Sequence, residues 1–158
     1  MSTTPDVAQQ SVASPANAQA AAALANLLHI VDWLFAECPW WRTQTHASLA
    51  SFVLEEAREV TAALLPLADF PVPGRLLPGT IAPEISSHLC SELGDLLLQV
   101  LSQAKLAELE GFFSLTDVLA QLSAKLERRH PHLFATAHAS TPEEVDALYA
   151  AVKAQERT

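Results

Sequence analysis

Two pairs of acidic residues stand at helical spacing in segments whose apolar residues follow one side. Glu56 and Glu59 form the first pair, and Glu92 and Asp95 form the second, each with i, i+3 spacing. When both segments are wound as helices, Glu56 and Glu92 fall inside the apolar stripes, and the other two acids lie at their edges. Each pair therefore presents two carboxylates on a side that also faces the interior.

Carboxylates that face an interior cannot all remain ionised and unpaired, because desolvation and mutual repulsion both oppose it. They must be protonated, paired with arginine or neutralised by bound cations. Oxygen ligands favour a hard divalent cation such as Mg²⁺ or Mn²⁺, and such an ion also takes phosphate oxygens as ligands. A di-iron centre is less favoured, because it normally uses Glu-x-x-His and neither pair contains histidine.

A basic segment near residues 115–130 could supply the other half of a phosphate site. Lys125 and Arg129 lie on the side of its apolar stripe, with Arg128 close by. Guanidinium groups bind phosphate oxygens through two parallel hydrogen bonds. Alternatively, these side chains only cover the core and place positive charge at a helix C-terminus. The residues alone favour neither interpretation.

Aromatic residues gather in the loop that follows Cys38 and Pro39. Trp40, Trp41 and His46 could form a flat surface on which a nucleobase stacks. The alternative is a packing role, since a tryptophan beside a proline between helices is more often part of the core.

Periodicity along the chain predicts an all-α fold. No run of alternating apolar residues indicates a strand. The expected helices are one that stops before Pro39, a second over about 48–65, a third over about 84–110 that ends at Gly111, a fourth from the Ser114 cap to near His130, and a fifth after the Thr141 cap.

Two further segments lack a helical pattern. Residues 1–15 are small and polar, which predicts a disordered tail. Residues 66–83 contain five prolines and two glycines, which predicts a long loop of the kind that often forms a lid or binding loop. We therefore expect one domain over 16–135, interrupted by this loop, and a C-terminal helix within 136–158.

Composition narrows the class of protein. The chain has 158 residues, of which 50% are hydrophobic and 17% charged, as expected for a folded domain. Its net charge of −9 disfavours a nucleic-acid partner. Two cysteines are too few for a disulfide framework or a cysteine zinc site. No signal peptide is evident, and polar residues interrupt the apolar run over 20–36, so we expect a cytoplasmic protein without a membrane span.

Four motifs, taken in order, resemble the MazG family. The resemblance covers about Leu24 to Phe134. The motifs are Cys38-Pro39-Trp40 with Gln44-Thr45-His46 and Ser48-Leu49, then Leu54-Glu55-Glu56-Ala57-Arg58-Glu59 for E-E-x-x-E, then Glu92-Leu93-Gly94-Asp95 for E-x-x-D, and finally the segment from Lys125 through Arg129-His130-Pro131-His132 to Phe134.

The resemblance implies an all-α, Mg²⁺-dependent nucleoside triphosphate pyrophosphohydrolase that releases a nucleoside monophosphate and pyrophosphate, in order to remove non-standard or surplus nucleotides. It also implies a homodimer or a dimer-based tetramer, and pairing would complete the helical bundle. The implied metal ligands are Glu56, Glu59, Glu92 and Asp95, with Glu56 also catalytic and Glu55 an auxiliary acid that positions or activates water. The implied substrate-binding residues are Trp40, Gln44, His46, Lys125, Arg128 and Arg129.

Three departures from the family pattern keep alternatives open. Trp41 stands where the family often has aspartate, residues 66–83 lengthen the gap between the acidic motifs, and there is one MazG unit where some members have two. One alternative is a nucleotide-binding or regulatory dimer with little turnover. Another is an enzyme like phosphoribosyl-ATP pyrophosphohydrolase, which the Cys-Pro-Trp loop and the Arg-His-Pro-His ending disfavour.

Overall fold

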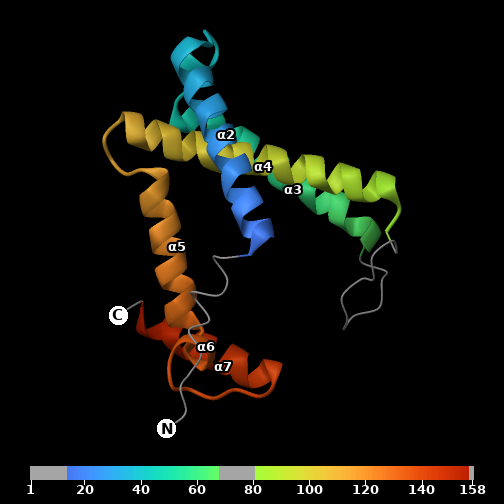
Figure 1. Ribbon diagram of the computed structural model, residues 1–158, viewed down its shortest axis with the longest axis vertical. Coiled ribbons are helices and arrows are strands. Elements are labelled where there is room, and N and C mark those ends of the chain that lie inside the picture. The colour runs from blue at the N-terminus through green and yellow to red at the C-terminus, as the bar shows by residue number, and fades with distance from the viewer. Residues whose placement is uncertain (1–13, 68–80, 157–158) are drawn as a thin grey trace. The chain divides into compact units, whose positions relative to one another are not determined.

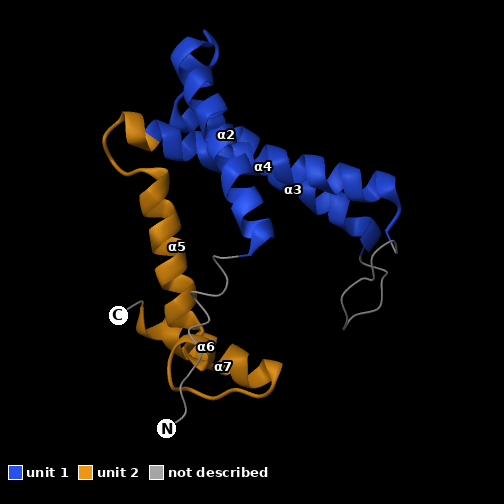
Figure 2. Cartoon of the chain, in the orientation of Figure 1, with its two compact units in different colours: residues 1–106 blue, residues 107–158 orange. Residues whose placement is uncertain are grey.

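The computed structural model describes residues 14–67 and 81–156, and all regular structure in these ranges is helical (Figure 1). The predicted all-α class is therefore confirmed. The elements are α2 (Pro15–Glu37), η1 (Trp41–Thr43), α3 (His46–Leu64), η2 (Leu65–Leu67), α4 (Pro83–Leu109), α5 (Leu115–Arg129), α6 (Pro131–Phe134) and α7 (Pro142–Gln155). The chain divides into two compact units, residues 1–106 and 107–158 (Figure 2). The boundaries expected from the sequence, 16–135 for the domain and 136–158 for the segment with the C-terminal helix, remain predictions.

Helix α2 begins at Pro15, which the sequence analysis assigned to the tail. The Ser14 side chain caps the helix by accepting a hydrogen bond from the Asn17 N–H at 3.1 Å, and Pro15 occupies the first turn. The alanine-rich stretch 16–23 extends the helix because alanine has the highest helix propensity. The remaining part of the predicted tail, and most of the predicted 66–83 loop, lie outside the described residues.

The start of α3 and the end of α4 are each fixed by a cap formed by residues close together in the sequence. At the start of α3, the Thr45 hydroxyl accepts from the Ser48 N–H at 3.1 Å, and the Ser48 hydroxyl accepts from the Thr45 N–H at 2.9 Å. After α4, Gly111 adopts a φ of 76°, and Phe112 N–H donates to the Ala107 carbonyl across the helix end. This left-handed cap confirms the predicted end of the helix at Gly111.

The core of the first unit lies among α2, α3 and α4. Its buried apolar side chains are Val31 and Phe35 from α2, Leu49, Val60 and Ala63 from α3, and Leu101, Ala104 and Leu106 from α4. Two polar residues of α4, Gln99 and Ser102, are buried in the same region of the helix. The packing of these stripes fixes which side of α3 faces α4.

Helix α2 is the one helix of the described ranges that is long and apolar enough to cross a membrane, a test that core helices of soluble proteins also pass. Its Asp32 binds Lys105 of α4 through an ion pair of 2.7 Å, and Phe35 is buried. Much of its remaining apolar surface, including Trp33 at 66% exposure, is uncovered within this chain.

The second unit contains α5, α6 and α7. Helix α5 begins with a reciprocal cap between Ser114 and Asp117, and α7 begins with the predicted cap between Thr141 and Glu144. Hydrogen bonds from Ser114 lower the pKa of the Asp117 carboxyl. The short helix α6 was not predicted from the sequence.

Candidate functional site

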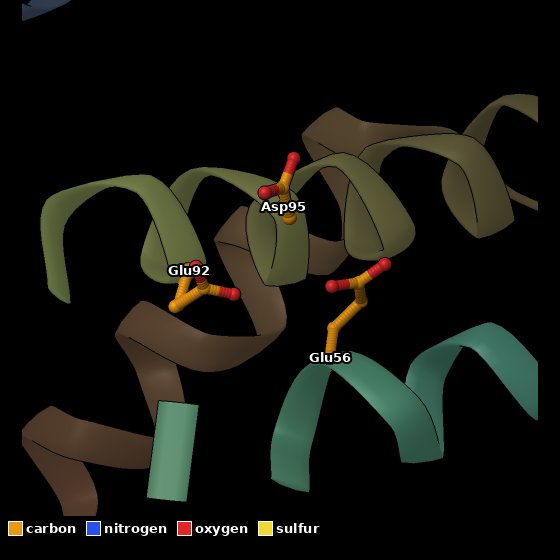
Figure 3. Close-up of side chains that lie close together, drawn as sticks. All are labelled: Glu56, Glu92 and Asp95. Carbon is orange, nitrogen blue, oxygen red and sulfur yellow. The ribbon is translucent and has the colours of Figure 1, made fainter. Parts of the chain in front are cut away.

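Three acidic side chains from two helices converge in the first unit (Figure 3). Glu56 comes from α3, and Glu92 and Asp95 come from α4. One carboxylate oxygen of each lies within 4.8 Å of the others. Oxygens that share one hard cation, each about 2.0–2.6 Å from it, have this spacing.

Helix periodicity explains why these carboxylates meet. Val60 and Ala63 follow Glu56 by four and seven residues, so all three lie on one side of α3, and both apolar residues are buried. Burying that side turns the Glu56 side chain toward α4. Glu92 and Asp95 are one turn apart on α4 and therefore lie next to each other.

Burial and neighbouring negative charge both act against the ionised form of Glu56 in this acidic cluster. Partial burial, followed by the charges of Glu59 and Asp95, raises the pKa of Glu56 above its ordinary value. The ion pairs formed within the described ranges join no lysine or arginine to the cluster, and the basic side chain that they place beside it is His88, whose Nδ1 lies 3.1 Å from Glu92 Oε1. Arginine pairing, one alternative left open by the sequence, is therefore not what the described residues form.

We expect Glu56→Gln to raise the stability of the metal-free protein at neutral pH. Because the folded chain holds the Glu56 proton more tightly than the unfolded chain, wild-type stability falls as pH rises from 4.5 through the raised pKa. The variant escapes this loss, so its Tm should be roughly 2 °C higher at pH 7.5. At pH 3.5, where Glu56 is protonated in both states, the two proteins should melt together.

Thermal denaturation in the presence of a chelator at the two pH values measures this difference. Glu84→Gln, an exposed change in the first turn of α4, is the matched control and should not reproduce the gain. A lower Tm for Glu56→Gln at pH 7.5 would contradict the repulsion argument.

The structure does not place all of the predicted acidic residues in the cluster. Glu59, predicted as a ligand, is exposed and is not a member of the group within 4.8 Å, although its charge contributes to the raised pKa of Glu56. Glu55 is also exposed on α3, and its charge acts on Glu56 in the same direction. Both carboxylates therefore border the cluster rather than form it.

The two tryptophans of the first loop differ in their surroundings. Trp41 packs on Phe35 of the core, with ring centroids 5.2 Å apart. Trp40 meets Trp41 edge to face at 4.9 Å and Phe52 at 6.1 Å, yet it remains 48% exposed. The packing alternative thus describes Trp41, while Trp40 keeps a surface that a planar group could contact.

Gln44 and His46 make contacts that link the loop to its neighbours. Gln44 Nε2 donates to the Trp40 carbonyl at 2.9 Å, and Gln44 Oε1 accepts from the Ser48 hydroxyl at 2.8 Å, so both ends of this amide have local partners. His46 Nδ1 lies 2.5 Å from Gln103 Oε1 of α4, which makes this nitrogen the donor. The substrate roles of Gln44 and His46 stay predictions.

The predicted phosphate-binding arginines form an ion-pair cluster in the second unit. Glu156, just after α7, accepts from Arg128 Nε at 2.7 Å and from Arg129 Nη2 at 2.5 Å. Arg129 Nη1 also donates to the Tyr149 hydroxyl at 2.8 Å, and its guanidinium lies over the Tyr149 ring. Lys125 lines a pocket of α5. Hydrogen bonds from Arg129 and Arg128 lower the pKa of Glu156 to about 2.

Sequence reasoning missed Tyr149, Glu156 and Gln103, which make these contacts, and also the buried residue Gln99. Tyr149 and Glu156 are separated by seven residues, so helical spacing could have placed them on one side of α7. Gln99 and Gln103 follow Glu92 by seven and eleven residues, which places them on its side of α4. No local signal paired any of them with a partner.

A protein-family model described as the MazG nucleotide pyrophosphohydrolase domain matches residues 44–134. The chain belongs to this family. The matched range contains all three members of the acidic cluster and the basic end of α5, whereas Trp40 and α7 lie outside it. The family resemblance inferred from the motifs is therefore confirmed.

Known proteins with similar sequences carry names that agree with this membership. An Escherichia coli K12 nucleoside triphosphate pyrophosphohydrolase is 42% identical over 120 residues, which are 76% of this chain and 39% of that protein. A Mycobacterium tuberculosis nucleoside triphosphate pyrophosphohydrolase is 33% identical over 136 residues, 85% of this chain and 36% of its own length.

A Thermotoga maritima nucleoside triphosphate pyrophosphohydrolase/pyrophosphatase MazG is 37% identical over 97 residues, or 61% of this chain and 31% of that protein. This MazG domain thus spans about two fifths or less of the length of each of these three relatives.

Proposed function

We propose that this MazG domain is a Mg²⁺-dependent hydrolase that cleaves nucleoside triphosphates between the α and β phosphates and so removes non-standard or surplus nucleotides. The observation that supports the proposal best is the convergence of Glu56, Glu92 and Asp95 without a lysine or arginine partner among the described residues. Carboxylates that converge in this way can hold a divalent cation, and such an ion also takes phosphate oxygens as ligands.

The donor set fits a hard divalent ion. Glu56, Glu92 and Asp95 each offer a carboxylate oxygen, and we assign Glu59 as a further ligand at the edge of the cluster. Carboxylates alone suit Mg²⁺ or Mn²⁺, whereas the group contains no histidine that would favour iron. When bound, the ion would polarise a phosphoryl oxygen and make water more acidic.

We assign the proton transfer and the binding of the substrate to residues of this chain. Glu55 accepts a proton from the water that attacks the α-phosphorus, as a new P–O bond forms and pyrophosphate leaves with the electrons of the broken bond. The basic side chains of α5 bind the departing phosphates, and Trp40 contacts the base. Positioning and charge stabilisation carry most of the catalysis in such transfers. The assigned phosphate-binding residues are Lys125, Arg128 and Arg129.

The test is a panel of ribo- and deoxyribonucleoside triphosphates incubated with the chain and Mg²⁺. We expect equal amounts of nucleoside monophosphate and pyrophosphate from at least one of them. No pyrophosphate from any nucleotide would reject the proposal. Tight binding without hydrolysis in calorimetry would instead support a regulatory dimer, and activity on phosphoribosyl-ATP alone would support the histidine-pathway type of enzyme.

We also propose that two copies of the chain pair, as a homodimer or within a dimer-based tetramer. On α4, Leu93, Leu97 and Val100 stand at i, i+4 and i+7 and are 49%, 42% and 47% exposed. An apolar stripe on one side of a helix is normally buried. Trp33 of α2 adds further exposed apolar surface in the same unit.

Leu97→Glu should therefore convert the protein to a species of half the mass, because a charge buried at an apolar interface is strongly unfavourable. Light scattering coupled to size exclusion measures the mass. Leu65→Glu changes a residue of η2 that is 66% exposed and lies outside this stripe, so it should leave the mass unchanged. A monomeric wild-type protein would contradict the pairing.

We propose a cytoplasmic location without a membrane or nucleic-acid partner. Nucleoside triphosphates are cytoplasmic metabolites, the charge of −9 repels nucleic acid, and Asp32 of α2 is held by Lys105 of the same unit.

A further inference from the structure

Gln99 is a buried polar residue whose amide oxygen has no partner among the described residues. It is 6% exposed, and Gln99 Oε1 has no hydrogen-bond donor within that part of the chain. The other buried polar residue of α4, Ser102, donates to the Leu98 carbonyl at 2.7 Å. Gln103, one turn later, accepts from His46. Of the two buried polar residues of α4, Gln99 is thus the one whose side-chain oxygen lacks a hydrogen bond.

A buried acceptor without a donor lowers stability, and an apolar side chain of similar shape would avoid that loss. Packing alone does not account for a glutamine at this position. Its oxygen is suited to a donor that arrives with a ligand.

Gln99 lies on the same side of α4 as the two acids that this helix contributes to the cluster. At 3.6 residues per turn, Gln99 lies about 20° from Glu92 and about 40° from Asp95 around the axis of α4, between the two. Side chains on a helix lean toward its N-terminus, so Gln99 lies over the turn that contains Asp95. Gln99 therefore follows Asp95 by about one turn on the side of α4 that carries both acids, and it is more buried than Asp95.

The chemistry of the acidic cluster limits which groups can donate a hydrogen bond to Gln99 Oε1. Carboxylates accept hydrogen bonds and do not donate them when ionised, and phosphate oxygens behave in the same way. A hydrated divalent cation brings water molecules whose hydrogens all point away from the ion and need acceptors. Such a water is the donor that an acidic site supplies to a neighbouring amide oxygen.

We propose that Gln99 is a positioning residue of the cation site: its amide oxygen accepts a hydrogen bond from a water in the hydration shell of the cation held by Glu56, Glu92 and Asp95. This inference rests on the proposed function. It predicts that the glutamine contributes to cation affinity in the absence of any nucleotide.

The experiment compares Mn²⁺ binding by wild-type protein, Gln99→Met and Gln103→Met, followed by electron paramagnetic resonance without nucleotide. Methionine keeps the length of the side chain and removes the acceptor. Gln99→Met should weaken Mn²⁺ binding by about 10–100-fold. Its metal-free Tm should be equal to or above that of the wild type, because an unpaired buried oxygen is lost.

Gln103→Met is the matched control on the same side of α4. It breaks the hydrogen bond to His46, so the metal-free Tm should fall while Mn²⁺ affinity stays within about twofold of the wild type. Gln99→Met is thus expected to weaken Mn²⁺ binding without lowering the Tm, and Gln103→Met to lower the Tm without weakening Mn²⁺ binding. A purely structural role of Gln99 would instead make both behave like the control.

Wild-type Mn²⁺ affinity in Gln99→Met would overturn this inference and leave the proposed function standing. A wild-type protein that binds no Mn²⁺ would overturn both. Should Gln99→Met fail to fold, Gln99→Asn withdraws the oxygen by one methylene and keeps the amide, and it must also weaken Mn²⁺ binding for the inference to survive.

Discussion

Glu56→Gln is expected to lower kcat/KM for triphosphate hydrolysis by about 10³-fold, the largest effect of any single change in this chain. The substitution keeps the size of the side chain but removes the one charge that α3 contributes to the acidic cluster. Charge stabilisation by a bound cation is worth several kcal/mol, and each 1.4 kcal/mol or so corresponds to a tenfold change in rate. Initial rates of pyrophosphate release at saturating Mg²⁺ measure the loss.

The control for this prediction is stability together with Glu84→Gln. Because Glu56→Gln is also expected to melt at a higher temperature, its loss of activity cannot be ascribed to unfolding. Glu84→Gln changes an exposed acid on α4 and should keep wild-type rates. Undiminished turnover in Glu56→Gln would remove this residue from the cation site.

The second large effect is expected for Arg129→Ala, which should lower kcat/KM by about 100-fold, mainly through a higher KM. One charge-assisted hydrogen bond to phosphate is worth about 1.5–3 kcal/mol, and the upper part of that range corresponds to a loss of this size. Arg129 also binds Glu156 and Tyr149, so its removal frees α7 from one of its contacts. Steady-state kinetics over a range of nucleotide concentrations separates KM from kcat.

Glu156→Gln distinguishes phosphate binding from a purely structural role of Arg129. This variant loses the same ion pair but keeps the guanidinium, so its kcat/KM should stay within a few-fold of the wild-type value. If it loses as much activity as Arg129→Ala, the arginine acts by holding α7 in place.

The pH dependence of stability checks the Glu156 ion pair itself. The folded-state pKa of Glu156 is about 2, below the ordinary 4.5, so the carboxylate contributes stability above pH 4.5 and loses that contribution as pH falls toward 2. Glu156→Gln should therefore melt below the wild type at pH 7 and with it near pH 2.

The helix ends and the carboxylate pairs could be predicted from the sequence, because they depend on residues that lie close together along the chain. The helix ends follow from caps such as Thr45 with Ser48 and from Gly111, because their partners lie within five residues along the chain. The carboxylate pairs likewise follow from i, i+3 spacing, since one helix turn places such residues side by side. Helix α2 begins at Pro15, the residue at which the predicted tail ends, because the Ser14 side chain caps the first turn.

Only tertiary structure decided which acids meet and which polar groups pair. Spacing places Glu56 and Glu59 on one side of α3, but the packing of α3 against α4 brings Glu56, and not Glu59, into the group with Glu92. In the same way, Arg129 forms a hydrogen bond with Glu156, 27 residues later, and His46 forms one with Gln103, 57 residues later. Sequence spacing sets the angle of a side chain around its own helix, whereas the register between two helices depends on how their buried side chains fit together.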